Sequence, residues 1–82
     1  MIKVYGKESC APCKMVKMIL DKKGIEYEYK DVELDSEAMD EMISLYEVTT
    51  VPIVVSKGRV MYGYTPSILM DMIKDYYEQQ KL

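Results

Sequence analysis

Hydrophobic and polar positions recur with two different periods along the chain, and each change of period predicts a new element. Residues 2–6 form a short β-branched and apolar run that stops at a glycine, which predicts a strand. From Pro12 the apolar positions fall three and four residues apart, which predicts a helix that ends at Gly24 behind two lysines. The expected buried face of this helix consists of Cys13, Val16, Ile19 and Leu20.

Alternation returns over residues 25–34 and predicts a second strand with one polar face. The helical period then restarts over residues 34–46, where Asp35 or Ser36 can cap a second helix. The apolar stripe expected on this helix consists of Met39, Met42, Ile43 and Tyr46.

Residues 49–64 predict two further strands, joined by a turn at residues 56–59. Thr65 as cap and Pro66 as first helical residue then start a last helix. Its expected apolar stripe consists of Leu69, Met72, Ile73 and Tyr76.

The predicted order of elements is therefore β-α-β-α-β-β-α. A helical crossover implies parallel strands in the first half of the chain, and a closing hairpin implies antiparallel strands in the second. The sequence predicts an α/β domain built on a four-stranded mixed sheet, with three helices on its two faces. We expect residues 1–82 to form this single domain.

Eight methionines and eight tyrosines stand out in a chain without tryptophan or phenylalanine. Most of the methionines lie at core or flanking positions of the predicted helices, where a flexible side chain fills gaps. We therefore expect them to be packing residues rather than metal ligands. The tyrosines are expected to pack with their hydroxyl groups at the surface.

The charge balance excludes several classes of partner. Eleven basic residues face fourteen acidic ones, for a net charge of −3, and no basic run marks a nucleic-acid-binding surface. The first residues lack the pattern of a signal peptide, and no apolar run approaches the roughly 18 residues that span a bilayer. We expect a cytoplasmic monomer that binds neither nucleic acid nor a membrane.

Both cysteines lie two residues apart in the stretch ESCAPCKMV, directly after the first predicted strand and at the start of the first helix. In a cytosolic protein a C-x-x-C motif next to a βαβ pattern is typical of a redox dithiol. A disulfide between Cys10 and Cys13 closes too small a loop to be an effective structural staple. Zinc needs four ligands, and this chain offers two cysteines and no histidine, so we expect no metal site.

The position of the motif predicts the role of each cysteine. At the start of a helix, Cys10 faces unpaired backbone N–H groups and the positive end of the helix dipole, and both favour the nucleophilic thiolate. Pro12 is tolerated there because a first-turn N–H has no partner within the helix. Cys13, one turn further on, can resolve a mixed disulfide formed by Cys10.

The chain resembles the glutaredoxin family of the thioredoxin fold over nearly its whole length. The resemblance rests on the segments Val4–Lys7, Cys10–Cys13, Lys23–Ile25 and Thr49–Pro52, together with Gly63 ahead of the last helix. It implies a thiol–disulfide oxidoreductase with Cys10 and Cys13 as catalytic residues. It also implies a cis bond between Val51 and Pro52, with the backbone of Val51 pairing with an extended substrate.

The same resemblance implies which residues bind the substrate or glutathione. Lys7 corresponds to a family lysine near the thiolate and the glutathione carboxylate. The full set of implied substrate-binding or glutathione-binding residues is Lys7, Pro12, Thr50, Val51, Pro52, Gly63, Tyr64 and Thr65. No tightly bound cofactor is implied, and glutathione would act as a co-substrate.

Two branches of the family remain open as interpretations. Glutathione-using members typically carry two glycines and then acidic residues where this chain has Gly63, Tyr64 and Thr65. The glycine–aromatic–x–proline pattern is similar to redoxins that are reduced by thioredoxin reductase and supply electrons to ribonucleotide reductase. The expected partners are therefore disulfide-containing proteins or glutathione mixed disulfides, with those two enzymes as the alternative. A module that docks to a partner or carries an iron–sulfur cluster is the hypothesis from another class.

Overall fold

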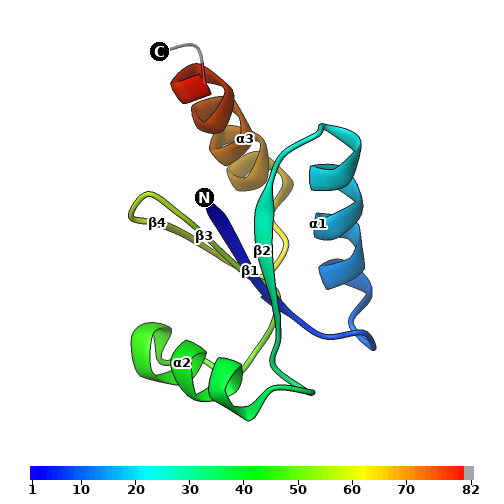
Figure 1. Ribbon diagram of the computed structural model, residues 1–82, viewed down its shortest axis with the longest axis vertical. Coiled ribbons are helices and arrows are strands. Elements are labelled where there is room, and N and C mark those ends of the chain that lie inside the picture. Colours follow the sequence, from blue (N-terminus) through cyan, green and yellow to red (C-terminus); the bar gives the residue numbers. More distant parts are fainter. Residues whose placement is uncertain (81–82) are drawn as a thin grey trace.

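The computed structural model describes residues 1–80, which fold into four strands and three helices (Figure 1). The first half contains β1 (Ile2–Gly6), α1 (Ala11–Lys22) and β2 (Tyr27–Asp31). It is followed by α2 (Ser36–Tyr46), β3 (Ile53–Ser56), β4 (Arg59–Tyr62) and α3 (Pro66–Gln80). The predicted order of elements is confirmed. The second strand is shorter than the alternation predicted, because the chain pairs with β1 only from Tyr27 onward.

The four strands form one mixed sheet in the order β2-β1-β3-β4. Strand β1 pairs in parallel with β2 and antiparallel with β3, and β3 pairs antiparallel with β4. The crossover through α1 thus gives the parallel pair and the hairpin gives the antiparallel one, as the connections require. Strand β1 lies at the centre of the sheet, so the loop after Gly6 leaves from its middle (Figure 1).

Each face of the sheet is covered by its own hydrophobic core. On one face, side chains of α1 and α3 pack with residues of β1, β3 and β4; the buried members are Ile2, Val4, Val16, Leu20, Ile25, Val54, Met61, Leu69, Met72 and Ile73. On the other face, α2 packs on a smaller core of Tyr5, Val32, Ala38, Met42 and Ile53. The alternation of Val4 and Tyr5 along β1 sends successive side chains into the two cores.

The helix boundaries follow local chemistry. Asp35 caps α2, because its side chain accepts hydrogen bonds from the backbone N–H groups of Glu37 and Ala38. Pro66 is the first residue of α3, as predicted. No helix within residues 1–80 is both long and apolar enough to cross a membrane.

Several packing expectations were wrong. Ile43 is 41% exposed, and Ala38 takes its place beside Met42 in the core of α2. Four of the eight methionines are exposed rather than packed in the core, namely Met1, Met15, Met18 and Met70. Apolar residues at helical spacing can therefore lie on two sides of one helix, which the period alone does not distinguish.

Tyr5 also departs from expectation, because its side chain is fully buried and its hydroxyl donates a hydrogen bond to Glu41 on α2. The Lys30 ammonium lies 3.0 Å from both carboxylate oxygens of Glu41, and that of Lys3 lies 3.7 Å from one of them. Burial and the carboxylate raise the pKa of Tyr5, so its hydroxyl stays protonated. Glu41 therefore ties α2 to the central strand β1 and to the edge strand β2.

Replacement of Glu41 tests this tie. Glu41→Gln should lower the free energy of unfolding at neutral pH by about 1–3 kcal/mol, the usual range for a lost hydrogen bond to a charged group. The tyrosine hydroxyl and the lysine hold the pKa of Glu41 below its ordinary value. Its ionic contribution is therefore present above the ordinary carboxyl value and is lost as the pH falls through the lowered one.

Urea denaturation measured at neutral and at acidic pH provides the check. Wild type and Glu41→Gln should differ at pH 7 and converge in acid, where Glu41 is protonated in both states of the wild type. Asp40→Asn is the matched control, because Asp40 is exposed on the same helix and accepts no side-chain hydrogen bond within residues 1–80. An equal loss in both variants would contradict a specific role for Glu41.

Candidate active site

Cys10 occupies the cap position at the start of α1, where the chain turns from strand to helix. Its backbone is extended, and its Sγ accepts a hydrogen bond of 3.1 Å from the backbone N–H of Cys13. Pro12 sits within the first helical turn, where its missing N–H costs no hydrogen bond. The sulfur of Cys10 therefore lies against the N–H groups at the positive end of the helix.

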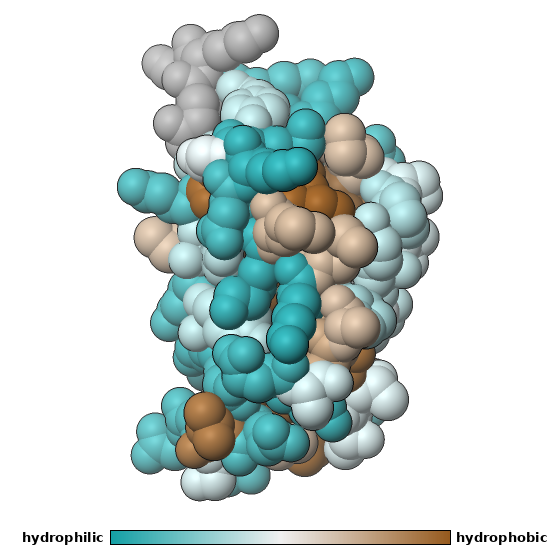
Figure 2. Space-filling model, turned by 90° about the vertical axis from the view of Figure 1, so that its right-hand side faces the viewer, coloured by the Kyte–Doolittle hydropathy of each residue, from teal (hydrophilic) through white to brown (hydrophobic). Residues whose placement is uncertain are grey.

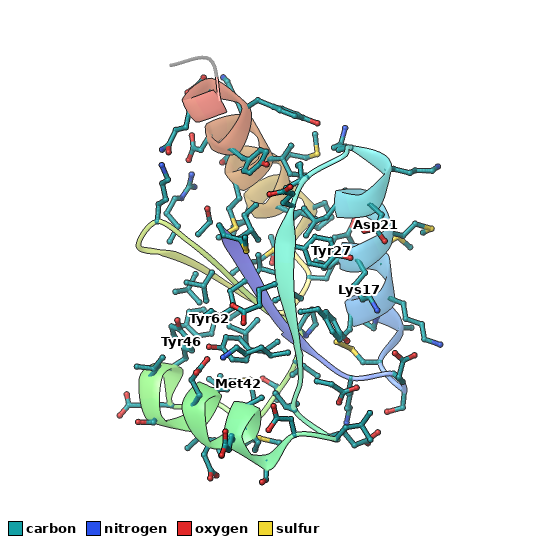
Figure 3. The ribbon with its side chains drawn as sticks, viewed as in Figure 1. Lys17, Asp21, Tyr27, Met42, Tyr46 and Tyr62 are labelled. Atoms are coloured by element: carbon teal, nitrogen blue, oxygen red, sulfur yellow. A yellow bond between two sulfur atoms is a disulfide. The ribbon has the colours of Figure 1, made fainter. Side chains whose placement is uncertain are left out.

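Cys10 and Cys13 form a disulfide, with their Cα atoms 5.2 Å apart (Figure 3). The two cysteines are not equally accessible. Cys10 keeps 9% of its surface exposed, whereas Cys13 has none. An attacking group from outside can therefore reach Cys10, and Cys13 can reach only what is already bonded to Cys10.

Cys13 packs directly over Gly6, the last residue of β1. A Cβ added at Gly6 would lie 3.1 Å from the Cβ of Cys13 and 2.6 Å from the hydroxyl oxygen of Tyr29 on β2. The absence of a side chain at Gly6 thus lets α1 approach the sheet this closely. The Lys17 ammonium covers the ring of Tyr29 at 4.2 Å from its centroid, which holds the ring at this side of the helix.

The loop before β3 completes the site, 41 residues away in sequence. The Val51–Pro52 peptide bond is cis, as the resemblance implied. The Sγ of Cys10 lies 3.9 Å from the carbonyl oxygen of Val51. The backbone N–H of Gly63 donates to the carbonyl of Pro52 at 2.8 Å, so the loop after β4 is joined to the proline loop.

The remaining residues of the predicted set lie around this point to different degrees. Lys7 is half-buried, and its carbonyl accepts a hydrogen bond of 3.2 Å from the Cys10 N–H. Thr50 is exposed beside Val51. Tyr64 packs against the core beneath α1 and α3, and Thr65 leads into α3, where its carbonyl bonds to the N–H of Leu69. Among the hydrogen bonds of residues 1–80, none joins Tyr64 or Thr65 to the dithiol.

Sequence reasoning did not include Gly6 and Tyr29 among the site residues. Gly6 was visible as the end of a strand and within the Val4–Lys7 segment, but its closeness to Cys13 depends on how α1 packs. Tyr29 comes from β2, and only the parallel register of β1 and β2 brings it to the dithiol. Burial and the nearby carboxylates of Asp31 and Glu8 raise the pKa of Tyr29, so it stays neutral. The sequence offered one signal for this role: Tyr29 lies on the apolar face of the predicted second strand.

The acidic residues and cysteines of the described chain do not gather into a metal site. Among residues 1–80, no three side chains of histidine, cysteine, aspartate or glutamate converge to hold an ion. Cys10 and Cys13 are bonded to each other. The arrangement is therefore a dithiol–disulfide centre, with one accessible and one buried sulfur at the start of a helix.

A strand, a dithiol at a helix start and a facing cis-proline define a thioredoxin-fold protein with a redox-capable cysteine pair. The glutaredoxin family model matches residues 2–61, and the chain belongs to the glutaredoxin family. Among known proteins, it is 36% identical over 77 residues to the Gene 56 protein of Mycobacterium phage L5, which covers 93% of this chain and 74% of that protein.

Solved structures agree in fold. The thioredoxin-like protein BC3987 superposes with a TM-score of 0.82 at 32% identity, over 88% of this chain and 99% of that one. The glutaredoxin-like protein NrdH-redoxin from Escherichia coli superposes with a TM-score of 0.76 at 20% identity, over 87% and 92% of the two chains. At 20% identity, the likeness to NrdH-redoxin shows a shared fold only.

The close approach at Gly6 can be tested by substitution. Gly6→Ala should destabilise the protein by about 1–3 kcal/mol, as overpacking typically does, because the new methyl group meets Cys13 and Tyr29. The free energy of unfolding from urea titration measures the loss. Adding Tyr29→Phe, which removes the nearest atom, should restore part of it. If the double variant is no more stable than the two single losses combined, the Gly6–Tyr29 contact is not the cause.

Proposed function

We propose that this protein is a glutaredoxin-type thiol–disulfide oxidoreductase that reduces disulfides of proteins or small molecules. One observation carries the proposal: the accessible sulfur of Cys10 is held at the start of a helix, between the Cys13 N–H and the carbonyl of Val51. Membership of the glutaredoxin family supports the same activity. We place the protein in the cytoplasm as a single-domain monomer.

In the reduced protein, Cys10 acts as the nucleophile. Its thiolate attacks one sulfur of the substrate disulfide, forms a mixed disulfide and releases the other sulfur as a thiolate that takes up a proton. The helix start stabilises the thiolate before the attack. The exposure of Cys10 and the burial of Cys13 support this order of events.

Cys13 completes the reaction. After losing its proton, it attacks the sulfur of Cys10, forms the Cys10–Cys13 disulfide and releases the second substrate thiolate. Two electrons thereby pass from the dithiol to the substrate, which leaves as two thiols. The Cα separation of 5.2 Å lies within the normal range for a disulfide, so ring closure needs no large movement of α1.

Substrate would lie along the proline loop. The backbone of Val51 next to the cis-proline is suited to pair with an extended peptide, which fixes the substrate without demanding a particular side chain. Pro12 and Thr50 are exposed beside this path, and Gly63 is tied to Pro52 by its N–H. We assign Lys7, Tyr64 and Thr65 to the rim of the same site.

The reductant that restores the dithiol is either glutathione or thioredoxin reductase. Glutathione is the co-substrate of the proposal, with Lys7 near its carboxylate. The second candidate is favoured by one observation: residues 63–65 carry no acid, and α2 carries acidic residues and no basic one. Neither region offers the charges that hold both ends of glutathione in the family. A redoxin reduced by thioredoxin reductase would have ribonucleotide reductase as its candidate acceptor.

Cysteine variants in a coupled assay test the proposal. Consumption of NADPH is followed with bis(2-hydroxyethyl) disulfide as substrate, in one arm with glutathione and glutathione reductase and in another with thioredoxin reductase. Cys10→Ser should abolish turnover in both arms, because no thiolate remains to attack. Cys13→Ser should accumulate a mixed disulfide on Cys10, detected by mass spectrometry, and should keep activity only with glutathione.

The two arms also separate the reductants. Turnover of the wild type in the glutathione arm supports the glutaredoxin proposal, whereas turnover in the thioredoxin reductase arm alone supports the second candidate. Full activity of Cys10→Ser would contradict both. A coloured, iron-containing protein without turnover in either arm would instead support the cluster-carrying or docking module.

A further inference from the structure

Helix α1 is apolar on two opposite sides. Cys13, Val16 and Leu20 are buried against the sheet. Ala11, Met15 and Met18, spaced four and three residues apart, form a second row that faces solvent. We call this row the outer stripe. Met15 and Met18 are 40% and 49% exposed, and Figure 2 shows the apolar surface running along this face of the molecule.

A row of lysines borders the outer stripe. Lys14, Lys17 and Lys22 line a shallow groove of about 380 Å³ together with Met18, Glu8 and Asp21. Asp21 accepts a hydrogen bond of 2.8 Å from Tyr27, and Lys17 lies over Tyr29. Figure 3 shows Lys17, Asp21 and Tyr27 between α1 and β2.

Three cations elsewhere in the molecule are paired with carboxylates, whereas most lysines within residues 1–80 are not. Lys3, Lys30 and Arg59 each lie within ion-pair distance of a carboxylate. Within residues 1–80, no carboxylate lies that close to the three lysines of the groove. With three lysines against Glu8 and Asp21, the groove carries one net positive charge in a protein whose net charge is −3. An unpaired positive row beside an apolar stripe is complementary to an acidic, apolar surface.

The outer stripe is also continuous with the reacting sulfur. Ala11 is the residue after Cys10, and both Ala11 and Pro12 are exposed. Methionine side chains are flexible and polarizable, so a methionine stripe can adapt to different apolar partners. A helical segment with leucines at a matching spacing could lie along it, as amphipathic helices do in hydrophobic grooves.

We propose that the outer stripe and its lysines form a docking surface for protein substrates that carry an acidic, apolar segment next to their reactive disulfide. This proposal rests on the proposed function and adds a substrate preference to it. Docking on α1 would hold the disulfide near Cys10 and speed the first attack. The chemical steps of the exchange stay the same, and small disulfides gain nothing from this surface.

Two synthetic peptides provide the probe. Both contain the same disulfide ring, followed by a tail with leucines at helical spacing; the remaining tail positions are glutamates in one peptide and lysines in the other. Stopped-flow measurement gives the rate constant at which the fully reduced protein reduces each peptide. At low salt the acidic peptide should react about tenfold faster or more, within the usual range of electrostatic steering. High salt should remove most of this preference.

Variants locate the effect on α1. Lys14→Glu/Lys22→Glu should reverse the ratio of the two rates, and the ratio is unaffected by any change in the reactivity of Cys10 itself. A third peptide, the disulfide ring without a tail, gives the reference rate. Met15→Gln/Met18→Gln should reduce the advantage that the acidic tail gives over this reference. Lys57→Glu, in the exposed turn between β3 and β4, makes the same type of charge change and should leave the ratio as in the wild type.

Each contrary outcome has a distinct meaning. Equal rates for the two peptides in the wild type would overturn the docking surface. So would an effect of Lys57→Glu on the ratio as large as that of Lys14→Glu/Lys22→Glu. In either case, reduction of bis(2-hydroxyethyl) disulfide would still uphold the proposed function. Failure to reduce that small disulfide would overturn both. Concentration-dependent association of the protein, abolished by Lys14→Glu/Lys22→Glu, would assign the surface to a second copy of the chain and overturn the substrate proposal.

Discussion

The close approach of α1 to Gly6 is the constraint on which the rest of the molecule depends. With no side chain at Gly6, Cys13 packs onto the end of the central strand and its own side chain becomes fully buried. The helix must then begin at Ala11, which leaves Cys10 at the cap with its sulfur against the Cys13 N–H. The absence of a side chain at Gly6 therefore permits both the close position of the helix and the burial of Cys13.

The second half of the chain brings the other side of the site to this point. Because β3 pairs with β1, the Val51–Pro52 loop arrives at the end of the sheet where α1 begins. The hairpin returns to the same end, and Gly63 bonds to Pro52. On the opposite face, Glu41 joins α2 to Tyr5 and Lys30. Burial on both faces makes β1 a rigid base for the dithiol.

The sequence predicted the elements, their order and the dithiol well, because periodicity, turn residues and C-x-x-C spacing are local signals. The roles of Gly6 and Tyr29 could not be predicted, since they depend on the register of β1 and β2 and on how closely α1 packs. Ile43 was misjudged for a related reason, and Met15 and Met18, expected to pack like the other methionines, are exposed. Helical spacing identifies residues that share a face, but it does not say whether that face meets the sheet or the solvent. The exposed methionines that resulted are the basis of the docking surface.

The central claim is that the helix start makes Cys10 a thiolate at neutral pH. The direct measurement is a titration of thiolate absorbance in the ultraviolet for the reduced protein, with Cys10→Ser as the reference that reports any signal from elsewhere. The account predicts that the signal assigned to Cys10 rises well below the ordinary thiol value of about 8.5. A midpoint at or above that value would contradict the claim that the helix start activates Cys10.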